Sequence, residues 1–440
     1  MRNLFLFTAT LCCLLKGLAQ SHQNAPSLDA TLSDCIEYAL KHQPLIQQSL
    51  IDEKIVEETI RTKLADWFPQ LNFNANYTHY IQLPTNYFGG NFVTTGSHNT
   101  SFADFAATQN IFNRDVLLAL RSKSQVKKAA EQITDSTTID IVAAVSKAFY
   151  EVLLTEKQVA VLDEDIVRLG RSLQDAYNQY NGGIVDKTDY KRATISLNNA
   201  KVQRKQQQDL LTAKYFYLRQ LMGYPDSNYL RLRYDSLQLE KEIFLDTLQE
   251  INYNNRIEYR LLQTEESLQE YNLKYYKWGI LPSVSAFGNY NINYFSNNFT
   301  KLYEQPFVNS NVGVQLAFPI FQGGKRSFQV RAAQWQVRRL AWEKTALQSI
   351  IRTQYAQAMA SYKGNLVNYN ALRENVQLAN DVYNVIRLQY QQGIKTYLDV
   401  IIAESDLRSA QLNFYEALYQ LLQSKIDVQK ALGTLVGNEN

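Results

Sequence analysis

The side chains that most often carry catalysis or bind metals have no useful spacing in this sequence. The segment Gly323–Arg326 lacks the first glycine and the Ser or Thr of a phosphate-binding loop. No nucleophile is paired with a base. The four histidines, His22, His42, His79 and His98, show none of the spacings typical of metal sites. The sequence therefore predicts no catalytic, cofactor-binding or metal-binding residues, and a protein that is not an enzyme.

A more informative pattern is a set of motifs that occurs twice, the second copy close to 210 residues after the first. A duplication with a constant offset predicts two structural copies of one unit. We place the first repeat at residues 20–235 and the second at 236–440, and expect function in the shape that both build together. The paired motifs are Pro69 and Pro282, Asn76-Tyr77 and Asn289-Tyr290, Ile111-Phe112 and Ile320-Phe321, Gly183-Ile184 and Gly393-Ile394, and Asp189 and Asp399.

Two stretches in each repeat have the alternation of apolar and polar side chains expected for a strand. They lie at about 70–80 and 101–112, and at about 283–293 and 310–321. Each is close to the length of a tilted transmembrane β-strand, which is about 9–11 residues. An ordinary sheet with one buried face would show the same alternation, so this pattern alone leaves both possibilities open.

Each repeat also contains a long helix, predicted at about 115–178 and 325–390. Apolar residues recur in these helices at alternating steps of three and four, which is the seam of a coiled coil. A glycine turn ends each one and a second helix returns from it. The turns contain Gly182 and Gly183 in the first repeat and Gly393 in the second, where a positive φ would by itself explain glycine.

The N-terminus and the composition indicate export. Residues 1–19 combine a basic start, an apolar run and a small-x-small cleavage pattern, so we predict a signal peptide there. Only Cys35 would remain after cleavage, so no internal disulfide can form. The net charge of +3 is too small to indicate nucleic-acid binding. No later stretch is apolar enough to predict a transmembrane helix.

If the strands cross a membrane, one chain cannot close a barrel, because every edge amide in lipid needs a partner. Three chains with four strands each would close a barrel of twelve strands. A barrel of that size is too wide for side chains to fill, so it would enclose an open lumen. The polar faces predicted to line it include Asn72, Asn74, Asn76, Ser283, Ser285 and Asn289. The helices would extend this lumen beyond the membrane.

Several segments closely resemble the TolC family of outer membrane efflux proteins. No single segment is specific, but their order and spacing in both copies cover nearly the whole mature chain. The segments are residues 31–40, the strand start after Phe68-Pro69, and residues 318–324, 390–399 and 431–435. The resemblance implies a mainly α fold with a small β part. It implies a homotrimer whose β-barrel of twelve strands, four per chain, continues into a long antiparallel α-helical coiled-coil tunnel.

The same resemblance implies a function, a location and partners. The protein would be the passive exit duct of a tripartite efflux pump or a one-step secretion system. It would lie in the bacterial outer membrane, with its helical part in the periplasm. Its partners would be a periplasmic adaptor (membrane fusion) protein, an inner-membrane pump reached through that adaptor, and outer membrane lipid. The cargo and the particular pump stay open, because the pump selects the substrate.

The resemblance also implies a gate latch at the periplasmic helix tips. In this latch, Tyr390 and Lys395 of the second repeat would bond to the turn formed by Thr188 and Asp189 of the first. The alternative for Lys395 is an exposed loop residue, whose ion pair would contribute only about 0–1 kcal/mol.

Two further site predictions come from the resemblance. Asp399 from three chains would ring the aperture, and Ile402 stands where better-known members carry a second Asp, so a single acidic ring or a partly apolar gate is expected. The alternative for Asp399 is a solvated carboxylate in a first helical turn, favoured by the helix dipole. Adaptors would dock at Gly182, Gly183 and Gly393. For the whole protein, the competing hypothesis is an exported coiled-coil adaptor or scaffold without a pore.

Overall fold

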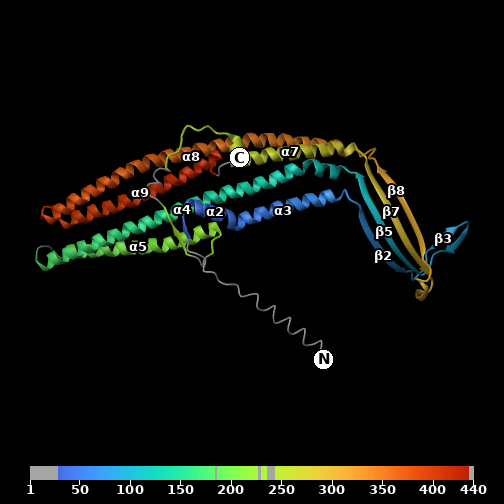
Figure 1. The fold of residues 1–440 in the computed structure, drawn as a ribbon, viewed down its shortest axis with the longest axis horizontal. Coiled ribbons are helices and arrows are strands. Elements are labelled where there is room, and N and C mark those ends of the chain that lie inside the picture. Colours follow the sequence, from blue (N-terminus) through green and yellow to red (C-terminus); the bar gives the residue numbers. More distant parts are fainter. Residues whose placement is uncertain (1–27, 184–185, 226–228, 235–242, 436–440) are drawn as a thin grey trace, which may run out of the picture. The chain divides into compact units, whose positions relative to one another are not determined.

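The computed structural model describes residues 28–183, 186–225, 229–234 and 243–435 (Figure 1). The predicted signal peptide at 1–19 lies outside these residues. The chain divides into two compact units. The helical unit comprises Met1–Gln47, Thr137–Asn252 and Ile351–Asn440, and the sheet unit comprises Gln48–Ser136 and Tyr253–Ile350. Each unit draws on both halves of the sequence, so contacts group the chain differently from the predicted repeats.

The sheet unit contains four long antiparallel strands in the order β2-β5-β7-β8, which lie side by side in one layer (Figure 1). Three follow the predicted ranges closely. The fourth ends at Ala317, four residues before the predicted end at Phe321, because Pro319 has no N–H to donate to the ladder. The strands are β2 (Gln70–His79), β5 (Asn99–Phe112), β7 (Ser283–Ser296) and β8 (Phe307–Ala317).

A small hairpin lies between the first two long strands, in a segment for which the sequence predicted no strand. It consists of β3 (Thr85–Phe88) and β4 (Asn91–Thr94), which pair antiparallel. Gly89 and Gly90 connect them with φ of 55° and 91°. A two-residue turn with both φ values positive matches the twist of a hairpin, which is why glycine occupies both positions.

Helices lead into and out of the four long strands. The helix α3 (Pro44–Ala65) precedes β2, and α4 (Arg114–Asn181) follows β5. In the second half, α7 (Ile257–Lys277) precedes β7 and α8 (Lys325–Gln391) follows β8. The long helices agree with the predicted ranges to within three residues at each end. Short 3-10 helices occur at η2 (Tyr253–Asn255), η3 (Trp278–Ile280) and η4 (Phe299–Lys301).

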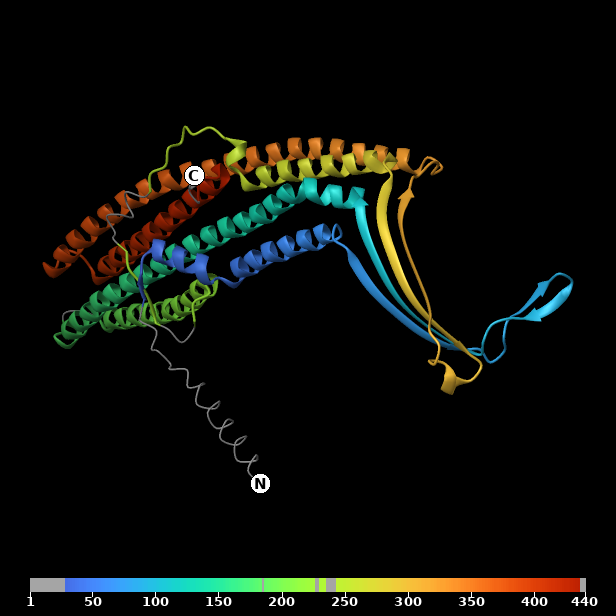
Figure 2. The same ribbon diagram turned by 45° about the vertical axis from the view of Figure 1, so that its right-hand side comes forward.

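The helical unit is built from two helical hairpins. The long helix α4 pairs with α5 (Lys187–Met222), and α8 pairs with α9 (Tyr397–Leu432), as Figures 1 and 2 both show. The helix α2 (Leu32–His42) packs against α5 and starts with a capping box, in which Thr31 and Asp34 bond to each other's backbone N–H.

The core of the helical unit brings distant parts of the chain together. Its largest buried side chains include Phe149, Leu218 and Tyr362, which are at most 2% exposed. The hydroxyl of Tyr362 donates to the carbonyl of Ile243 at 2.9 Å, so this buried polar group is satisfied. A short parallel pair, β1 (Leu28–Ala30) and β6 (Leu230–Leu232), joins the start of the described chain to the segment after α5.

None of the described helices contains a stretch of 18 residues apolar enough to cross a bilayer.

Candidate functional site

One face of the long-stranded sheet carries polar side chains from all four strands, interspersed with Phe102, Phe287 and Phe307. The register places Asn289 opposite Asn311 and Asn291 opposite Asn309, and the amide of the first in each pair donates to the second at 3.0 and 2.8 Å. Because alternate residues of a strand share a face, the pairing puts Asp104 on this side as well. The polar side chains of this face, called the polar face below, include Asn72, Asn74, Asn76, Asp104, Ser283, Ser285, Asn289, Asn291, Asn309 and Asn311.

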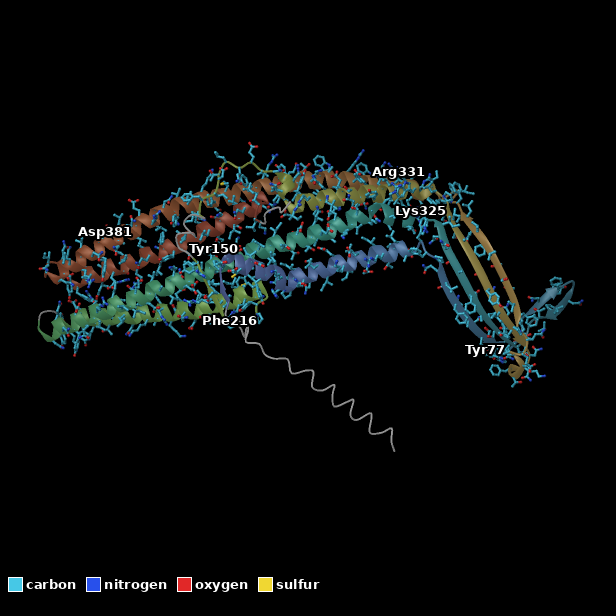
Figure 3. All side chains as sticks on the ribbon, in the orientation of Figure 1. Tyr77, Tyr150, Phe216, Lys325, Arg331 and Asp381 are labelled. Atoms are coloured by element: carbon cyan, nitrogen blue, oxygen red, sulfur yellow. The ribbon has the colours of Figure 1, made fainter. Side chains whose placement is uncertain are left out.

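The opposite face is apolar and exposed. Val312 is 89% exposed and Phe73 58% exposed, although a water-soluble sheet buries such side chains. Tyr77 marks the end of the sheet opposite Lys325 (Figure 3), and its hydroxyl donates to Asn99 at 2.7 Å. An apolar face of this extent indicates contact with lipid or with another apolar surface.

The glycine turn of the first hairpin follows from backbone geometry. Gly183 has a φ of 67°, which L side chains rarely adopt, and its N–H donates to the carbonyl of Tyr180 at 3.0 Å. Gly182 has no positive φ, so the turn does not require glycine there. Asp186 then caps α5 by accepting from the N–H of Thr188 at 3.3 Å.

The second hairpin turn is closed by a capping box that uses the predicted gate residue. Gly393 has a φ of 72° and ends α8. Thr396 then caps α9: its N–H and its hydroxyl donate to the carboxylate of Asp399 at 2.9 and 2.8 Å, and the N–H of Asp399 donates back at 3.3 Å. The hydroxyl bond from Thr396 is the main reason that the pKa of Asp399 is lowered. Asp399 is therefore a charged residue of the first turn of α9.

The two hairpins of one chain contact each other near their tips through tyrosines. The hydroxyl of Tyr390 on α8 donates to the side-chain oxygen of Gln179 on α4 at 2.7 Å. Burial raises the pKa of Tyr390, so its hydroxyl stays neutral. The ring of Tyr390 lies 5.7 Å from that of Tyr397, which is buried with Ala176 and Ala193. One cluster thus includes residues from α4, α5, α8 and α9.

The other predicted latch residues lie at the starts of the returning helices α5 and α9. Thr188 and Asp189 occupy the first turn of α5, and Lys395 lies in the exposed turn before α9. Among the described residues of one chain, no hydrogen bond or ion pair joins Lys395 to Thr188 or Asp189. Ile402, on the second turn of α9, is 51% exposed. The structure of one chain thus brings Tyr390 to Gln179, which the sequence did not single out.

A buried charge cluster, defined here as Asp165 and Arg168 of α4 with Glu404 and Arg408 of α9, lies elsewhere in the helical unit. The carboxylate of Asp165 accepts from Arg408 at 2.9 Å and from Arg168 at 3.3 Å. The Nε of Arg168 lies 3.6 Å from the carboxylate of Glu404. The side chains of Asp165 and Glu404 are 0% and 1% exposed. Burial, followed by the charge of Asp165, raises the pKa of Glu404 to about 7.

Sequence reasoning missed this cluster for a physical reason. Asp165 and Arg408 are 243 residues apart, and no pattern in a single sequence pairs two such charges. The available signal was local: Asp165 lies directly before Ile166 of the apolar seam, where a carboxylate must be either solvated or paired.

The described residues contain no group of three or more His, Cys, Asp or Glu side chains arranged to hold a metal ion. A model of the family described as outer membrane efflux protein matches residues 35–224 and 262–434. The chain belongs to the outer membrane efflux protein family. Membership confirms the resemblance drawn from the sequence segments, the mainly α fold with a small β part, and the localisation in the outer membrane.

Individual relatives of this efflux protein are distant in sequence but align along most of its length. Outer membrane protein TolC of Escherichia coli (strain K12) is 22% identical over 433 residues, covering 96% of this chain and 86% of TolC. Proteases secretion protein PrtF of Dickeya chrysanthemi is 20% identical over 427 residues, covering 92% and 88%. The CmeC outer membrane channel of Campylobacter jejuni has a similar fold, with a TM-score of 0.73 at 15% identity over 95% of this chain and 90% of CmeC.

Proposed function

We propose that this efflux protein is a passive trimeric channel-tunnel, the exit duct of a tripartite efflux pump or a one-step secretion system. The observation that carries the proposal is the sheet with two unlike faces. One face presents asparagines and Asp104, whereas the other exposes apolar side chains such as Val312. The wall of a transmembrane β-barrel needs one polar and one apolar face, with the polar face toward the lumen and the apolar face toward lipid.

The topology supports closure by three chains. The outer strands β2 and β8 end the sheet on its two sides. In lipid, their outward N–H and C=O groups need partners, and a second copy of the same sheet supplies them without any new element. Three copies of this four-stranded sheet make a barrel of twelve strands, wide enough for an open lumen. The helices after the strands would continue that lumen as a tunnel in the periplasm.

The gate would lie at the hairpin tips. Asp399 and Ile402 would narrow the aperture, and Tyr390, Lys395, Thr188 and Asp189 would form the latch. The bond from Tyr390 to Gln179 supports this proposal, because it already joins one hairpin to the other. Lys395 would find Thr188 and Asp189 on a neighbouring chain. Unchanged single-channel conductance in both Lys395→Ala and Asp189→Asn would contradict the latch.

The same tips would bind the periplasmic adaptor protein, through which the channel would reach an inner-membrane pump. Gly182 supports this role more than Gly183 or Gly393, because it is exposed and its backbone conformation does not require glycine. An exposed residue without a side chain lets another backbone approach closely. Crosslinking of a Gly182→Cys variant to its adaptor in cells would test the contact.

The duct itself is tested with the purified protein. We expect heat-resistant trimers in the outer membrane fraction and stepwise ion conductance in planar bilayers. A water-soluble monomer without conductance would overturn the proposal and favour an exported scaffold without a pore.

A further inference from the structure

The buried charge cluster borders a cavity within the helical unit. This cavity, of about 320 Å³, lies between α4, α5 and α9 and is lined by Leu169, Ser196, Asn199, Gln203, Glu404 and Arg408 among others. A cavity of this size with a polar lining has room for water. Glu404 is therefore buried from the outside yet has polar neighbours through which a proton can reach it.

Glu404 has an incomplete set of partners in this site. Among the described residues, neither of its carboxylate oxygens has a hydrogen-bond partner, and the Nε of Arg168 at 3.6 Å is beyond hydrogen-bond distance. The two guanidinium groups of the cluster instead donate to Asp165. A buried carboxylate without hydrogen bonds is strongly disfavoured in its charged form.

The charged and titratable groups facing Glu404 come from three helices, and no arginine among the described residues donates a hydrogen bond to it. Arg168 is shared with Asp165, Arg408 bonds Asp165 and Ser405, and the hydroxyl of Tyr397 has no hydrogen-bond partner among the described residues. The cavity side contributed by α5 carries uncharged side chains. The titratable and charged neighbours are Asp165 and Arg168 from α4, Tyr383 and Arg387 from α8, and Tyr397 and Arg408 from α9.

We propose that Glu404 is a proton-binding site through which pH controls how tightly α9 packs against α4. Asp165 accepts hydrogen bonds from both arginines whether Glu404 is protonated or charged. The contact between α4 and α9 through Asp165 and Arg408 is therefore kept in both states. Protonation removes the one charge without a hydrogen bond. It also gives Glu404 an O–H donor, and the side-chain amide oxygens of Asn199 and Gln203 in the cavity lining are acceptors of the right kind.

The direction of the pH effect follows from linkage. The pKa of Glu404 is raised from 4.5 to about 7 in the folded chain, mainly by burial. The folded state therefore binds this proton more tightly than an opened state in which Glu404 reaches water. The resulting stabilisation is fully present below pH 4.5 and is lost as the pH rises through about 7. The packing of α9 on α4 is thus tighter at pH 6 than at pH 8.

Hydrogen exchange of the purified full-length protein tests this inference. For amides in α4 and α9 around the cluster, we expect the equilibrium constant for opening, corrected for intrinsic exchange, to increase about tenfold from pH 6 to pH 8. In Glu404→Gln, which carries a permanently neutral group of the same shape, that increase should disappear. Glu164→Gln is the matched control, because Glu164 also lies near Arg168, at 3.8 Å, but is 69% exposed. It should keep the wild-type profile.

Two outcomes would overturn the inference: a pH-independent wild type, or a Glu404→Gln variant that retains the full pH dependence. If Glu404→Gln does not fold, infrared spectroscopy of the wild type replaces it. A protonated carboxyl band that titrates near pH 7 is then expected, and its absence would equally contradict the proposal.

The consequence for transport rests on the proposed channel function. If the hairpins must separate for the tunnel to open, wild-type conductance should rise from pH 6 to pH 8, and Glu404→Gln should stay at the low-pH level. Failure of the channel proposal is distinguishable, because a protein without conductance would still show the pH-dependent exchange. Conductance without pH-dependent hydrogen exchange would contradict the proton-binding role of Glu404 but would be consistent with the proposed channel.

Discussion

The helical unit joins its two hairpins in two different ways. Near the tips, Tyr390 of α8 donates one neutral hydrogen bond to Gln179 of α4. In the charge cluster, Asp165 of α4 is fully buried and bonds two guanidinium groups, one of them Arg408 of α9. Both contacts link the first hairpin to the second, but one is neutral and partly exposed and the other is ionic and buried.

The two contacts therefore differ in the free energy needed to break them. A neutral hydrogen bond contributes about 0.5–1.5 kcal/mol, because water replaces it when it breaks. Removing one partner of a buried ion pair is unfavourable by about 3–5 kcal/mol, because the remaining charge stays buried without a counterion. In the proposed channel, the contact at the tips would therefore break at a lower free-energy cost than the ionic contacts of Asp165. The following variants test this comparison, from the largest expected effect to the smallest.

The largest effect is expected from Asp165→Ala. It leaves Arg168 and Arg408 without their shared carboxylate, so we expect the free energy of unfolding to fall by about 3–5 kcal/mol. Denaturant unfolding followed by circular dichroism measures it. The control is Glu164→Ala, since Glu164 is 69% exposed and should contribute about 0–1 kcal/mol. Equal midpoints for the two variants would contradict the holding role of the cluster.

At the tips, a backbone effect should come next. Gly393→Ala forces a Cβ onto a φ of 72°, which should destabilise the turn by roughly 1–2 kcal/mol, although a Cβ there would have no atom within 4 Å. Gly182→Ala is the control, because Gly182 has no positive φ. The same unfolding measurement compares them. A stable Gly393→Ala would show that the turn adapts to a Cβ.

A smaller change in stability but a visible change in gating is expected from Tyr390→Phe. The ring stays and one hydrogen bond to Gln179 is lost, which reduces stability by about 0.5–1.5 kcal/mol. Single-channel recordings should show longer or more frequent openings. Tyr177→Phe serves as control, because Tyr177 contacts Tyr190 through its ring. If both variants gate like the wild type, the tip bond has no part in opening.

The smallest effect on stability should come from Asp399→Asn. The Asn side-chain oxygen can still accept the hydrogen bonds from Thr396, but the negative charge is removed. If Asp399 rings the aperture, cation selectivity in bilayers falls in this variant. Thr396→Ala is the complementary control: it removes the cap, at about 1 kcal/mol, and leaves the carboxylate charged. Loss of selectivity in Thr396→Ala alone would mean that Asp399 acts only through helix capping.

Much of the local structure could be predicted from the sequence. Strand alternation located β2 and β7 from their first residue, and the heptad seam located both long helices. These patterns are readable because each depends on the periodicity of one element against water or apolar surroundings. The end of β8 was predicted too late because the alternation was followed past Pro319, and the strands β3 and β4 of the small hairpin were not predicted.

The candidate site was less predictable. Tyr390 and Asp399 were predicted from the sequence as latch and gate residues, and those roles stay predictions; their bonding partners within the chain, Gln179 and Thr396, were not identified. Asp399 and Thr396 are near in sequence, so a capping-box pattern could have suggested that pair. Tyr390 and Gln179 are 211 residues apart, and only the docking of one hairpin on the other brings them together.

The sequence by itself determined the elements, their order and the polarity of each strand face, because these follow from periodicity and from the fixed geometry of helix and strand. Only the tertiary structure decided which charges meet. Asp165 and Glu404 lie on helices from opposite halves of the chain, and their burial beside two arginines depends on how α9 packs on α4. Electrostatic free energies depend on distance and desolvation, and neither quantity is encoded in the order of residues.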